Sequence, residues 1–497
     1  MIVRKLLATL GVVVGLGLVG SAAGPGWSPA PYTGALAVES TDLAIGGDVV
    51  TTPVGTYEVG TEIVEVPLDG ATVQAEVSFP VVAEPGARHP GVVFIHGAGT
   101  GHHTAFQETA RALASAGVVA MVPDKRLDTY TTRHRDYVAM AEDYLVSVAA
   151  LRARPDVDPA RVGVYGESEG GWIAPVAAAL DPDVAFLVQV SSPVVPPRQQ
   201  AAFAMDSYLR NVGVPTALLR VIPRSVGATV PGGGFEYADF DVRPYQRQVT
   251  QPTLVFYGTA DASMPTVQGA EIMVEDLAAA GNDAVTVRYV EDANHGIRVD
   301  GVLVPEFTDA LARWVLGLPV TATAAPQVAG AEPVQAHAAA PVAHPRWFAD
   351  GQNLVTGVQL ALGAVALGPV LWFGSVVVRR RARPLPSPLA RWMGGLVLGV
   401  VTLFAVFGAY LVRVAGLALN YQTDPVSVVG GWVALEALAV TAAGLFVLSL
   451  SRVARAYRSG ALARTGWIGR ITVVGVHLGS LGLLLAAAYW GLFPPVL

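Results

Sequence analysis

The 497-residue chain contains no cysteine, and only 14% of its residues are charged. The absence of cysteine excludes disulfide bonds, thiolate metal sites and cysteine catalysis, although it leaves the cellular compartment open. So small a charged fraction, together with a mean hydropathy of +0.48, is unusual for a soluble protein and predicts membrane spans. The chain is also too long for one ordinary domain.

Lysine and acidic residues are almost missing from the last part of the chain. Residues 351–497 hold 11 Arg, no Lys and two acidic residues, a net charge of +9, whereas the other 350 residues hold 21 basic and 37 acidic residues, a net charge of −16. We therefore expect an acidic globular part and a basic, apolar tail. Nucleic-acid binding is not favoured, because the arginines of the tail lie between apolar stretches, as membrane topology requires.

Residues 1–23 have the pattern of a secretory signal. Arg4 and Lys5 precede an apolar core from Leu6 to Gly20, and Ser21-Ala22-Ala23 offers small residues for cleavage. The alternative is an uncleaved signal anchor, and both place the following residues outside the cytoplasm. Residues 24–61 are rich in Gly, Pro and Thr, and we expect them to be irregular.

Residues 62–317 alternate between strand and helix patterns. A β-hairpin is expected over 62–66 and 72–77 around Asp69-Gly70. Because strands and helices then alternate, the pattern predicts an α/β domain with a mostly parallel sheet and helices on both faces. The expected strands are 91–95, 118–122, 161–165, 184–190, 253–257 and 284–290, and the expected helices are 104–116, 136–152, 170–180, 199–211, 266–280 and 304–316.

Residues 196–250 interrupt this alternation. We interpret them as a cap that shapes a substrate pocket, and the alternative is a surface excursion without a role. Residues 318–350 are rich in Ala and Pro and are interpreted as a linker. His337 and His344 lie in this linker without other ligands nearby, so no metal site is expected there.

Residues 351–497 are expected to form an all-α transmembrane domain of four spans. The apolar stretches are long enough to cross a bilayer as helices, and they cover about residues 354–378, 392–415, 426–450 and 468–492. Charged groups within such spans usually face other helices, so an ion pair between Arg413 and Glu436 is one option. A further polar residue, His477, lies in the fourth span.

The loops between these spans differ in charge. Residues 416–425 contain no Lys or Arg, so the positive-inside rule places the other two loops in the cytoplasm and the globular part outside it. We therefore expect a multi-pass protein of the cell membrane. The arginines of the first loop are Arg379, Arg380, Arg381, Arg383 and Arg391, and those of the second are Arg452, Arg455, Arg458 and Arg464, with Arg470 at its edge.

A candidate nucleophile follows the apolar run that ends at Tyr165. The segment Gly166-Glu167-Ser168-Glu169-Gly170-Gly171 has the Gly-x-Ser-x-Gly spacing, with a strand pattern before it and a helix pattern after it. Gly166 and Gly170 permit a turn tight enough to expose the Ser168 hydroxyl in a strained backbone conformation. The N-terminus of the following helix favours developing negative charge.

A serine needs a base, an acid that orients the base, and donors for the oxyanion. His295 follows an expected strand and precedes the last helix of the domain, and Asp261 follows the strand before it. Glu291 and Asp292 are rival acids, but they lie very close in sequence to His295.

The oxyanion donors are expected on two segments. One is the backbone N–H of Glu169, and the other comes from the loop His96-Gly97-Ala98-Gly99, in which Ala98 is the first candidate and His96 braces the loop.

These motifs together resemble an α/β-hydrolase of the dienelactone hydrolase and prolyl-oligopeptidase-like serine group, over about half of the chain. The matching segments, in order, are 93–99, 123–126, 166–172, 258–265 and 294–296. The resemblance implies hydrolysis of an ester, thioester or amide through an acyl-serine intermediate, without a metal or other cofactor. The acidic neighbours Glu167 and Glu169 would disfavour anionic substrates if they faced the serine.

We therefore expect a membrane-tethered extracytoplasmic serine hydrolase acting on a small-molecule or lipid acyl substrate. Two alternatives stay open. One is an acyltransferase for lipid or envelope acceptors, because water and an alcohol can use the same acyl-enzyme. The other is a membrane sensor or transport component whose hydrolase-like domain only binds a ligand.

Overall fold

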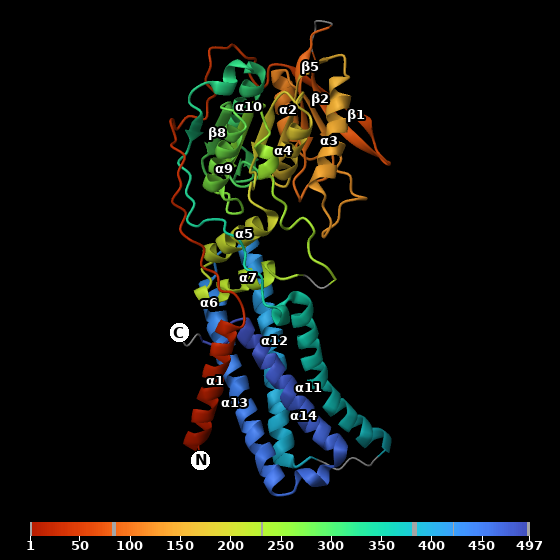
Figure 1. The fold of residues 1–497 in the computed structure, drawn as a ribbon, viewed down its shortest axis with the longest axis vertical. Helices are drawn as coiled ribbons and strands as arrows, with labels where there is room; N and C mark the ends of the chain where they lie inside the picture. Colours follow the sequence, from red (N-terminus) through yellow and green to blue (C-terminus); the bar gives the residue numbers. More distant parts are fainter. Residues whose placement is uncertain (1, 82–85, 230–231, 380–384, 421, 495–497) are drawn as a thin grey trace. The chain divides into compact units, whose positions relative to one another are not determined.

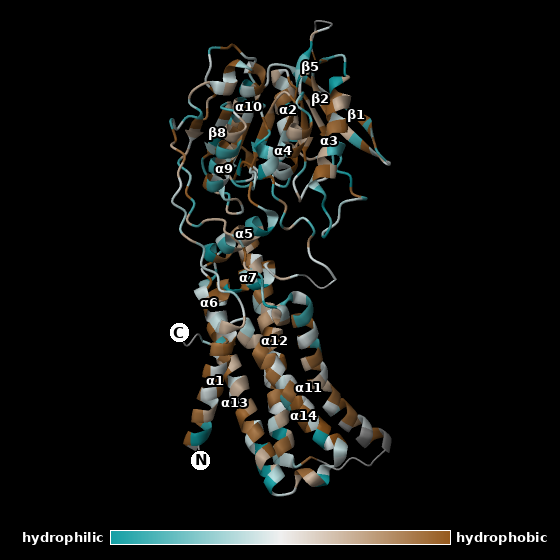
Figure 2. Ribbon diagram, viewed as in Figure 1, coloured by the Kyte–Doolittle hydropathy of each residue, from teal (hydrophilic) through white to brown (hydrophobic). Residues whose placement is uncertain are grey.

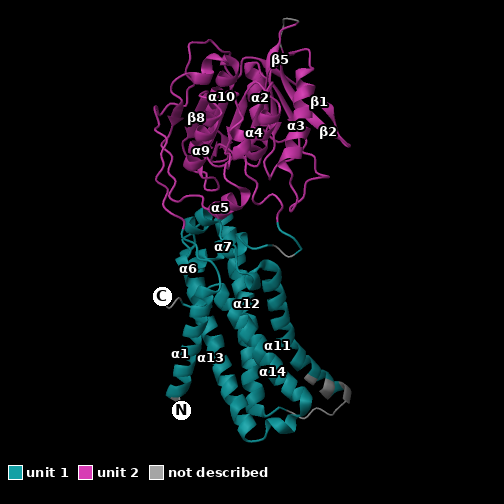
Figure 3. Ribbon diagram, in the orientation of Figure 1, with its two compact units in different colours: residues 1–28, 205–234, 342–497 teal, residues 29–204, 235–341 magenta. Residues whose placement is uncertain are grey.

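The computed structural model describes residues 2–81, 86–229, 232–379, 385–420 and 422–494. The chain forms two compact units, shown in Figure 3. The α/β unit comprises residues 29–204 and 235–341, and the helical unit comprises residues 1–28, 205–234 and 342–497.

The α/β unit is built on a nine-stranded sheet in the order β1-β2-β4-β3-β5-β6-β7-β8-β11. The β1–β2 and β2–β4 pairs are antiparallel, and all the later pairs are parallel. The expected hairpin and the mostly parallel sheet are therefore confirmed. The strands are β1 (Glu58–Leu68), β2 (Ala71–Val81), β3 (His89–Ile95), β4 (Val119–Pro123), β5 (Val157–Glu167), β6 (Leu187–Val190), β7 (Thr253–Gly258), β8 (Val285–Val290) and β11 (Val328–Gly330), with β9 (Arg298–Val299) and β10 (Val302–Leu303) as a separate pair.

Helices cover both faces of this sheet (Figure 1). Val93 and Ile95 of β3 pack in one core cluster with α3, α4 and α9, whereas Val92 and Phe94 pack in the other with α2 and α10. Successive strand residues point to opposite faces, so a strand buried on both sides must be apolar throughout. The covering helices are α2 (Gln107–Ala116), α3 (Tyr137–Arg152), α4 (Gly170–Leu180), α9 (Thr266–Ala279) and α10 (Pro305–Gly317). Of the other helices, α5 (Pro197–Asn211) begins in the α/β unit and ends in the helical unit, and α8 (Arg243–Gln246) lies in the α/β unit.

The ninth strand was not predicted. Residues 318–350 were expected to be a linker, but Val328–Gly330 pairs in parallel with β8 and extends the sheet. Gly330 has a φ of 109°, and a Cβ at this position would overlap the backbone oxygen of Tyr289. A three-residue strand without alternation carries no periodic signal, so only the tertiary structure reveals it.

The helical unit contains helices that are long and apolar enough to cross a membrane, five of them within the described residues (Figure 2). Four lie at the expected C-terminal spans, and the fifth is the N-terminal segment. The predicted cytoplasmic residues Arg380, Arg381 and Arg383 lie outside the described residues. The helices are α1 (Ile2–Ala22), α11 (Gly351–Arg379), α12 (Ser387–Leu419), α13 (Gly431–Arg458) and α14 (Gly466–Tyr489).

Helix α1 packs inside this unit. Gly20 lies so close to α14 that a Cβ there would overlap the carbonyl oxygen of Ala488, and a Cβ on Gly444 of α13 would lie 3.7 Å from Thr9. The absence of a side chain thus permits the close helix approach that membrane bundles favour.

Arg224 joins the ends of α1 and α14. It lies in the short helix α7 (Val221–Val226) and is 2% exposed. Its guanidinium donates to the carbonyl oxygens of Gly20 (3.0 Å), Gly24 (3.1 Å) and Tyr489. Carbonyl groups at a helix C-terminus lack intrahelical partners and carry partial negative charge, so a cation there is stabilising.

The polar residues of the spans pair differently from the expectation. Arg413 forms an ion pair with Asp424 at 2.9 Å, not with Glu436. Glu436 accepts a hydrogen bond from Trp432 Nε1 (3.1 Å), one helical turn earlier. The Arg413–Glu436 option was therefore wrong, because the turn after α12 brings Asp424 to the arginine first.

The packing of α1 predicts that this helix remains in the mature protein. Because the chain has no cysteine, Thr9→Cys with Gly444→Cys should form a disulfide between α1 and α13 on mild oxidation of membranes, visible after protease cleavage of the linker. Leu10, which is 59% exposed, supplies the control: Leu10→Cys with Gly444→Cys should stay uncrosslinked. A mature N-terminus near residue 24 would contradict the prediction.

Candidate active site

Ser168 lies at the tight turn between β5 and α4. Its φ is 56°, in the left-handed region that non-glycine residues rarely adopt. A Cβ at Gly166 would lie 2.5 Å from the Gly170 oxygen, and a Cβ at Gly170 would overlap the oxygen of Ile95. Both glycines are therefore required sterically, and the turn leaves the Ser168 side chain partly exposed.

Asp261 and His295 come from the loops after β7 and β8. Asp261 Oδ2 lies 2.8 Å from His295 Nδ1, and the Asp261 side chain is fully buried. Ser263 Oγ donates to Asp261 Oδ1 at 2.7 Å and lies 3.2 Å from the same histidine nitrogen. The rival acids at 291 and 292 are exposed and make no hydrogen bond to His295 within the described chain.

Two hydrogen bonds through the end of β6 connect the serine turn to the loop after β8. Ser168 N donates to Val190 O at the end of β6 (3.0 Å), and Ser191 Oγ donates to His295 O (2.8 Å). Across the described residues, no hydrogen bond joins Ser168 Oγ to His295. Catalytic hydrogen bonds are often long without substrate and tighten in the substrate complex.

Burial and charge compete at the Asp–His pair. Burial acts to lower the pKa of His295, but the charge and hydrogen bond of Asp261 outweigh it and raise that pKa above its ordinary value. Burial acts to raise the pKa of Asp261, but His295 and Ser263 outweigh it and lower that pKa. The pair therefore favours an ionised aspartate beside a basic imidazole.

The loop after β3 lies against the serine. A Cβ on Gly97 would lie 3.1 Å from Ser168 Cβ, so a side chain there would crowd Ser168. The backbone N–H groups of Ala98 and Glu169 donate to no acceptor among the described residues, which leaves both free for an oxyanion.

His96 braces this loop. Its Nε2 faces Pro123 O at 2.7 Å and therefore carries the proton, while Nδ1 lies 3.1 Å from Thr100 Oγ1. Burial lowers the pKa of His96 to about 4, so the ring stays neutral at physiological pH.

The Glu169 side chain points away from solvent into a cluster of donors. It is 1% exposed and accepts from Lys125 Nζ (3.0 Å), Arg135 Nη1 (2.5 Å) and Tyr130 Oη (2.9 Å). The suggestion that Glu169 repels anionic substrates is therefore wrong, because two cations compensate its charge.

Glu167, on the other side of Ser168, is half-buried. It accepts a hydrogen bond from Tyr165 Oη (3.0 Å). Burial raises the pKa of Glu167, although His295 acts in the opposite direction.

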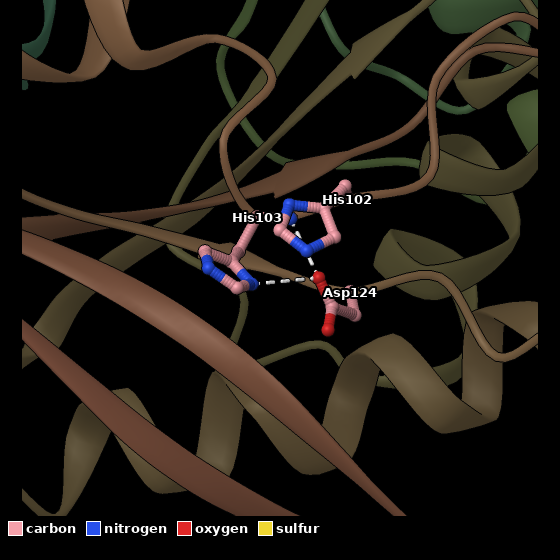
Figure 4. Close-up of side chains that lie close together, drawn as sticks. All are labelled: His102, His103 and Asp124. Carbon is pink, nitrogen blue, oxygen red and sulfur yellow. Dashed lines mark hydrogen bonds and ion pairs between the residues drawn. The ribbon is translucent and has the colours of Figure 1, made fainter.

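A second polar cluster lies on the same loop (Figure 4). His102, His103 and Asp124 have ligand atoms within 4.8 Å of one another, the types that bind divalent metals. Asp124 Oδ1, however, already accepts from the backbone N (2.6 Å) and Nδ1 (2.8 Å) of His103. These bonds account for the cluster as a second brace that ties the loop to the end of β4.

The expected cap is divided between the two units. Residues 235–250 pack in the α/β unit, where the rings of Tyr237 and Phe240 lie 5.9 Å and 5.0 Å from the ring of Tyr137. Residues 205–234 belong to the helical unit. Both parts were expected to form one insertion, although Pro231-Gly232-Gly233-Gly234 lies in the sequence at the boundary between them.

Two functional contacts were missed from the sequence. Lys125 was noted only as part of a matching motif, and its signal is a lysine two residues after the end of the buried strand β4. Ser263 was not considered, although an Asp-x-Ser turn places the hydroxyl next to the carboxylate.

The strand order and the placement of the serine turn and the Asp–His pair define an α/β-hydrolase. Residues 79–202 match the family described as Dienelactone hydrolase family, so the chain carries a domain of that family. A thiohydrolase of Arthrinium phaeospermum is 29% identical over 127 residues, which is 25% of this chain and 41% of that relative's length.

Solved structures of hydrolases are also similar to this chain. An esterase of Pyrobaculum calidifontis is 22% identical and covers 54% of this chain and 88% of its own, with a TM-score of 0.39. A dienelactone hydrolase of Anabaena variabilis is 20% identical, and the match covers 52% of this chain and 99% of that enzyme, with a TM-score of 0.36.

We predict that the negative charge of Asp261 raises the pKa of His295. Asp261→Asn removes that charge and leaves burial largely unopposed, so the His295 pKa should fall. Histidine hydrogen–deuterium exchange read by mass spectrometry measures this for each histidine. His134, which pairs with Glu236, serves as the internal control and should not shift. An unchanged His295 pKa would show that Asp261 is not its partner in solution.

Proposed function

We propose that this chain is a membrane-tethered extracytoplasmic serine hydrolase that cleaves an ester, thioester or amide. The observation that carries the proposal is the 2.8 Å hydrogen bond between Asp261 and His295. It lies at the carboxyl ends of the parallel strands, where Ser168 adopts its strained turn. The three residue types in this chain order are those of a nucleophile, an orienting acid and a base.

In the proposed reaction, Ser168 Oγ attacks the carbonyl carbon of the substrate while His295 takes the hydroxyl proton. The N–H groups of Ala98 and Glu169 stabilise the oxyanion. Collapse breaks the bond to the leaving group, which receives the proton from His295. Water then attacks the acyl-serine by the same route and releases the carboxylic acid.

The substrate is a small acyl compound in this proposal. The similarity to a thiohydrolase covers residues of this domain only in part, but it makes thioesters a natural choice beside simple esters in a first substrate panel. The site needs no metal for the proposed steps, because the general base and the oxyanion donors come from the chain itself.

The helical unit supports an extracytoplasmic active site. Arg4 and Lys5 lie at the start of α1, and the arginines of 452–470 lie around the end of α13 and the start of α14. By the positive-inside rule, α1 and α14 therefore both begin on the cytoplasmic side and end on the outer side of the membrane. Their C-terminal ends both contact Arg224, which agrees with a common direction. In the chain, the α/β unit follows the outer end of α1.

A fluorophosphonate probe should label Ser168 in the full-length protein. Ser168→Ala should abolish labelling and lower turnover of p-nitrophenyl butyrate by at least about 10³-fold, because the nucleophile is lost. Ser207→Ala, which alters another partly exposed serine, is the matched control and should retain both. Turnover that is equal in wild type and Ser168→Ala would refute the proposal.

Single cysteines should report the topology. Val50→Cys lies at a fully exposed position of the α/β unit and should react with a membrane-impermeant maleimide on intact cells. Ser459→Cys, after α13, should react only when the membrane is permeabilised. The reverse labelling pattern would place the active site in the cytoplasm.

A further inference from the structure

We infer that Lys125 is a positioning residue for the oxyanion hole, because it joins the two backbone segments that supply the oxyanion donors. This inference rests on the proposed function and adds a residue to it. Lys125 does not touch the reacting atoms and acts through Gly97 and Glu169.

The ammonium group lies between both segments. Lys125 Nζ donates to the backbone oxygen of Gly97 at 2.6 Å and to Glu169 Oε2 at 3.0 Å. The side chains of Lys125 and Glu169 are 2% and 1% exposed, so water does not compete for these bonds. Gly97 belongs to the loop after β3, and Glu169 follows the nucleophile.

The contact with Gly97 has a direct consequence for Ala98. The Gly97 carbonyl and the Ala98 N–H belong to the same planar trans peptide, so they point in opposite directions. Holding the oxygen on Lys125 therefore fixes the direction of the Ala98 N–H. The positive charge also draws electron density toward the Gly97 oxygen and makes the Ala98 N–H a stronger donor.

The contact with Glu169 fixes the second donor. The Glu169 carboxylate is held by Lys125, Arg135 and two tyrosine hydroxyls, Tyr130 and Tyr137. A side chain held at this many points restrains its own backbone, and the backbone N–H of Glu169 is the other proposed oxyanion donor. Lys125 thus restrains the distance between the backbone N–H groups of Ala98 and Glu169.

A purely structural ion pair would look different. Asp276 is also fully buried and also binds two cations, Arg243 and Arg247, each at 2.8 Å. Among the described residues, neither arginine forms a hydrogen bond or ion pair with the serine turn or the loop after β3. Removing one cation from each cluster therefore separates a general loss of stability from a specific loss of transition-state binding.

The experiment measures steady-state kinetics of full-length Lys125→Met in detergent with p-nitrophenyl butyrate, and its affinity for a trifluoromethyl ketone. The ketone forms a tetrahedral adduct whose oxyanion needs the same donors. We expect kcat to fall about 10- to 100-fold, less than the loss of a whole donor, with KM changed by less than about threefold. Ketone affinity should fall in parallel with kcat/KM.

Two further variants keep the test decisive. Arg243→Met should leave kcat and ketone affinity unchanged at a comparable loss of thermal stability. If the single variant fails to fold, Lys125→Met with Glu169→Gln removes one charge of each sign, keeps the net charge of the cluster unchanged and leaves Arg135, whose side chain is 16% exposed, as its cation. It should fold and keep the kinetic defect, because the Gly97 oxygen still lacks its donor.

The outcomes distinguish the two proposals. Wild-type protein without turnover or probe labelling would refute the serine hydrolase itself. Active wild type with unchanged kcat and ketone affinity in both lysine variants would overturn the role of Lys125 alone. A rise in KM with unchanged kcat would also overturn it, because this pattern indicates lost substrate binding and not lost transition-state stabilisation.

Discussion

The tight turn at Ser168 is the constraint on which the α/β unit depends. A non-glycine residue with a φ of 56° is strained, and such strain persists only where the surroundings determine the conformation. Here the surroundings are the end of β3, the end of β6 and the first turn of α4, which leave no room for a Cβ at Gly166 or Gly170. The central parallel strands thereby hold Ser168 at the same end of the sheet as the loops that follow β7 and β8.

A buried cluster of charges lies directly behind this turn. Burying Lys125 and Glu169 costs desolvation free energy, which their mutual attraction offsets only with good geometry and further hydrogen bonds. Arg135, Tyr130 and the Gly97 oxygen provide those bonds. The cluster connects the loop after β3 to the residue after Ser168, so the charges are placed where geometry matters for the proposed reaction.

The helical unit follows a different physical rule. Its helices approach closely where glycines replace larger residues, as at Gly20 beside Ala488. Arg224 satisfies its donors with carbonyl oxygens at helix ends and not with a carboxylate. This arrangement makes α1 part of the helical bundle, as the signal-anchor alternative requires. The direction of α1 and α14 then agrees with the charge pattern of the loops.

The sequence by itself determined the local features of this protein. Strand and helix periodicity, the Gly-x-Ser-x-Gly spacing and the apolar stretches are short-range signals, and they predicted the α/β sheet, the serine turn and four C-terminal helices. The tertiary structure decided which distant residues meet. It pairs His295 with Asp261 and not with Glu291 or Asp292. It buries the Glu169 side chain against Lys125 and pairs Arg413 with Asp424. It also adds β11 to the sheet. Side-chain direction and long-range pairing depend on packing across the whole chain, and no local pattern encodes them.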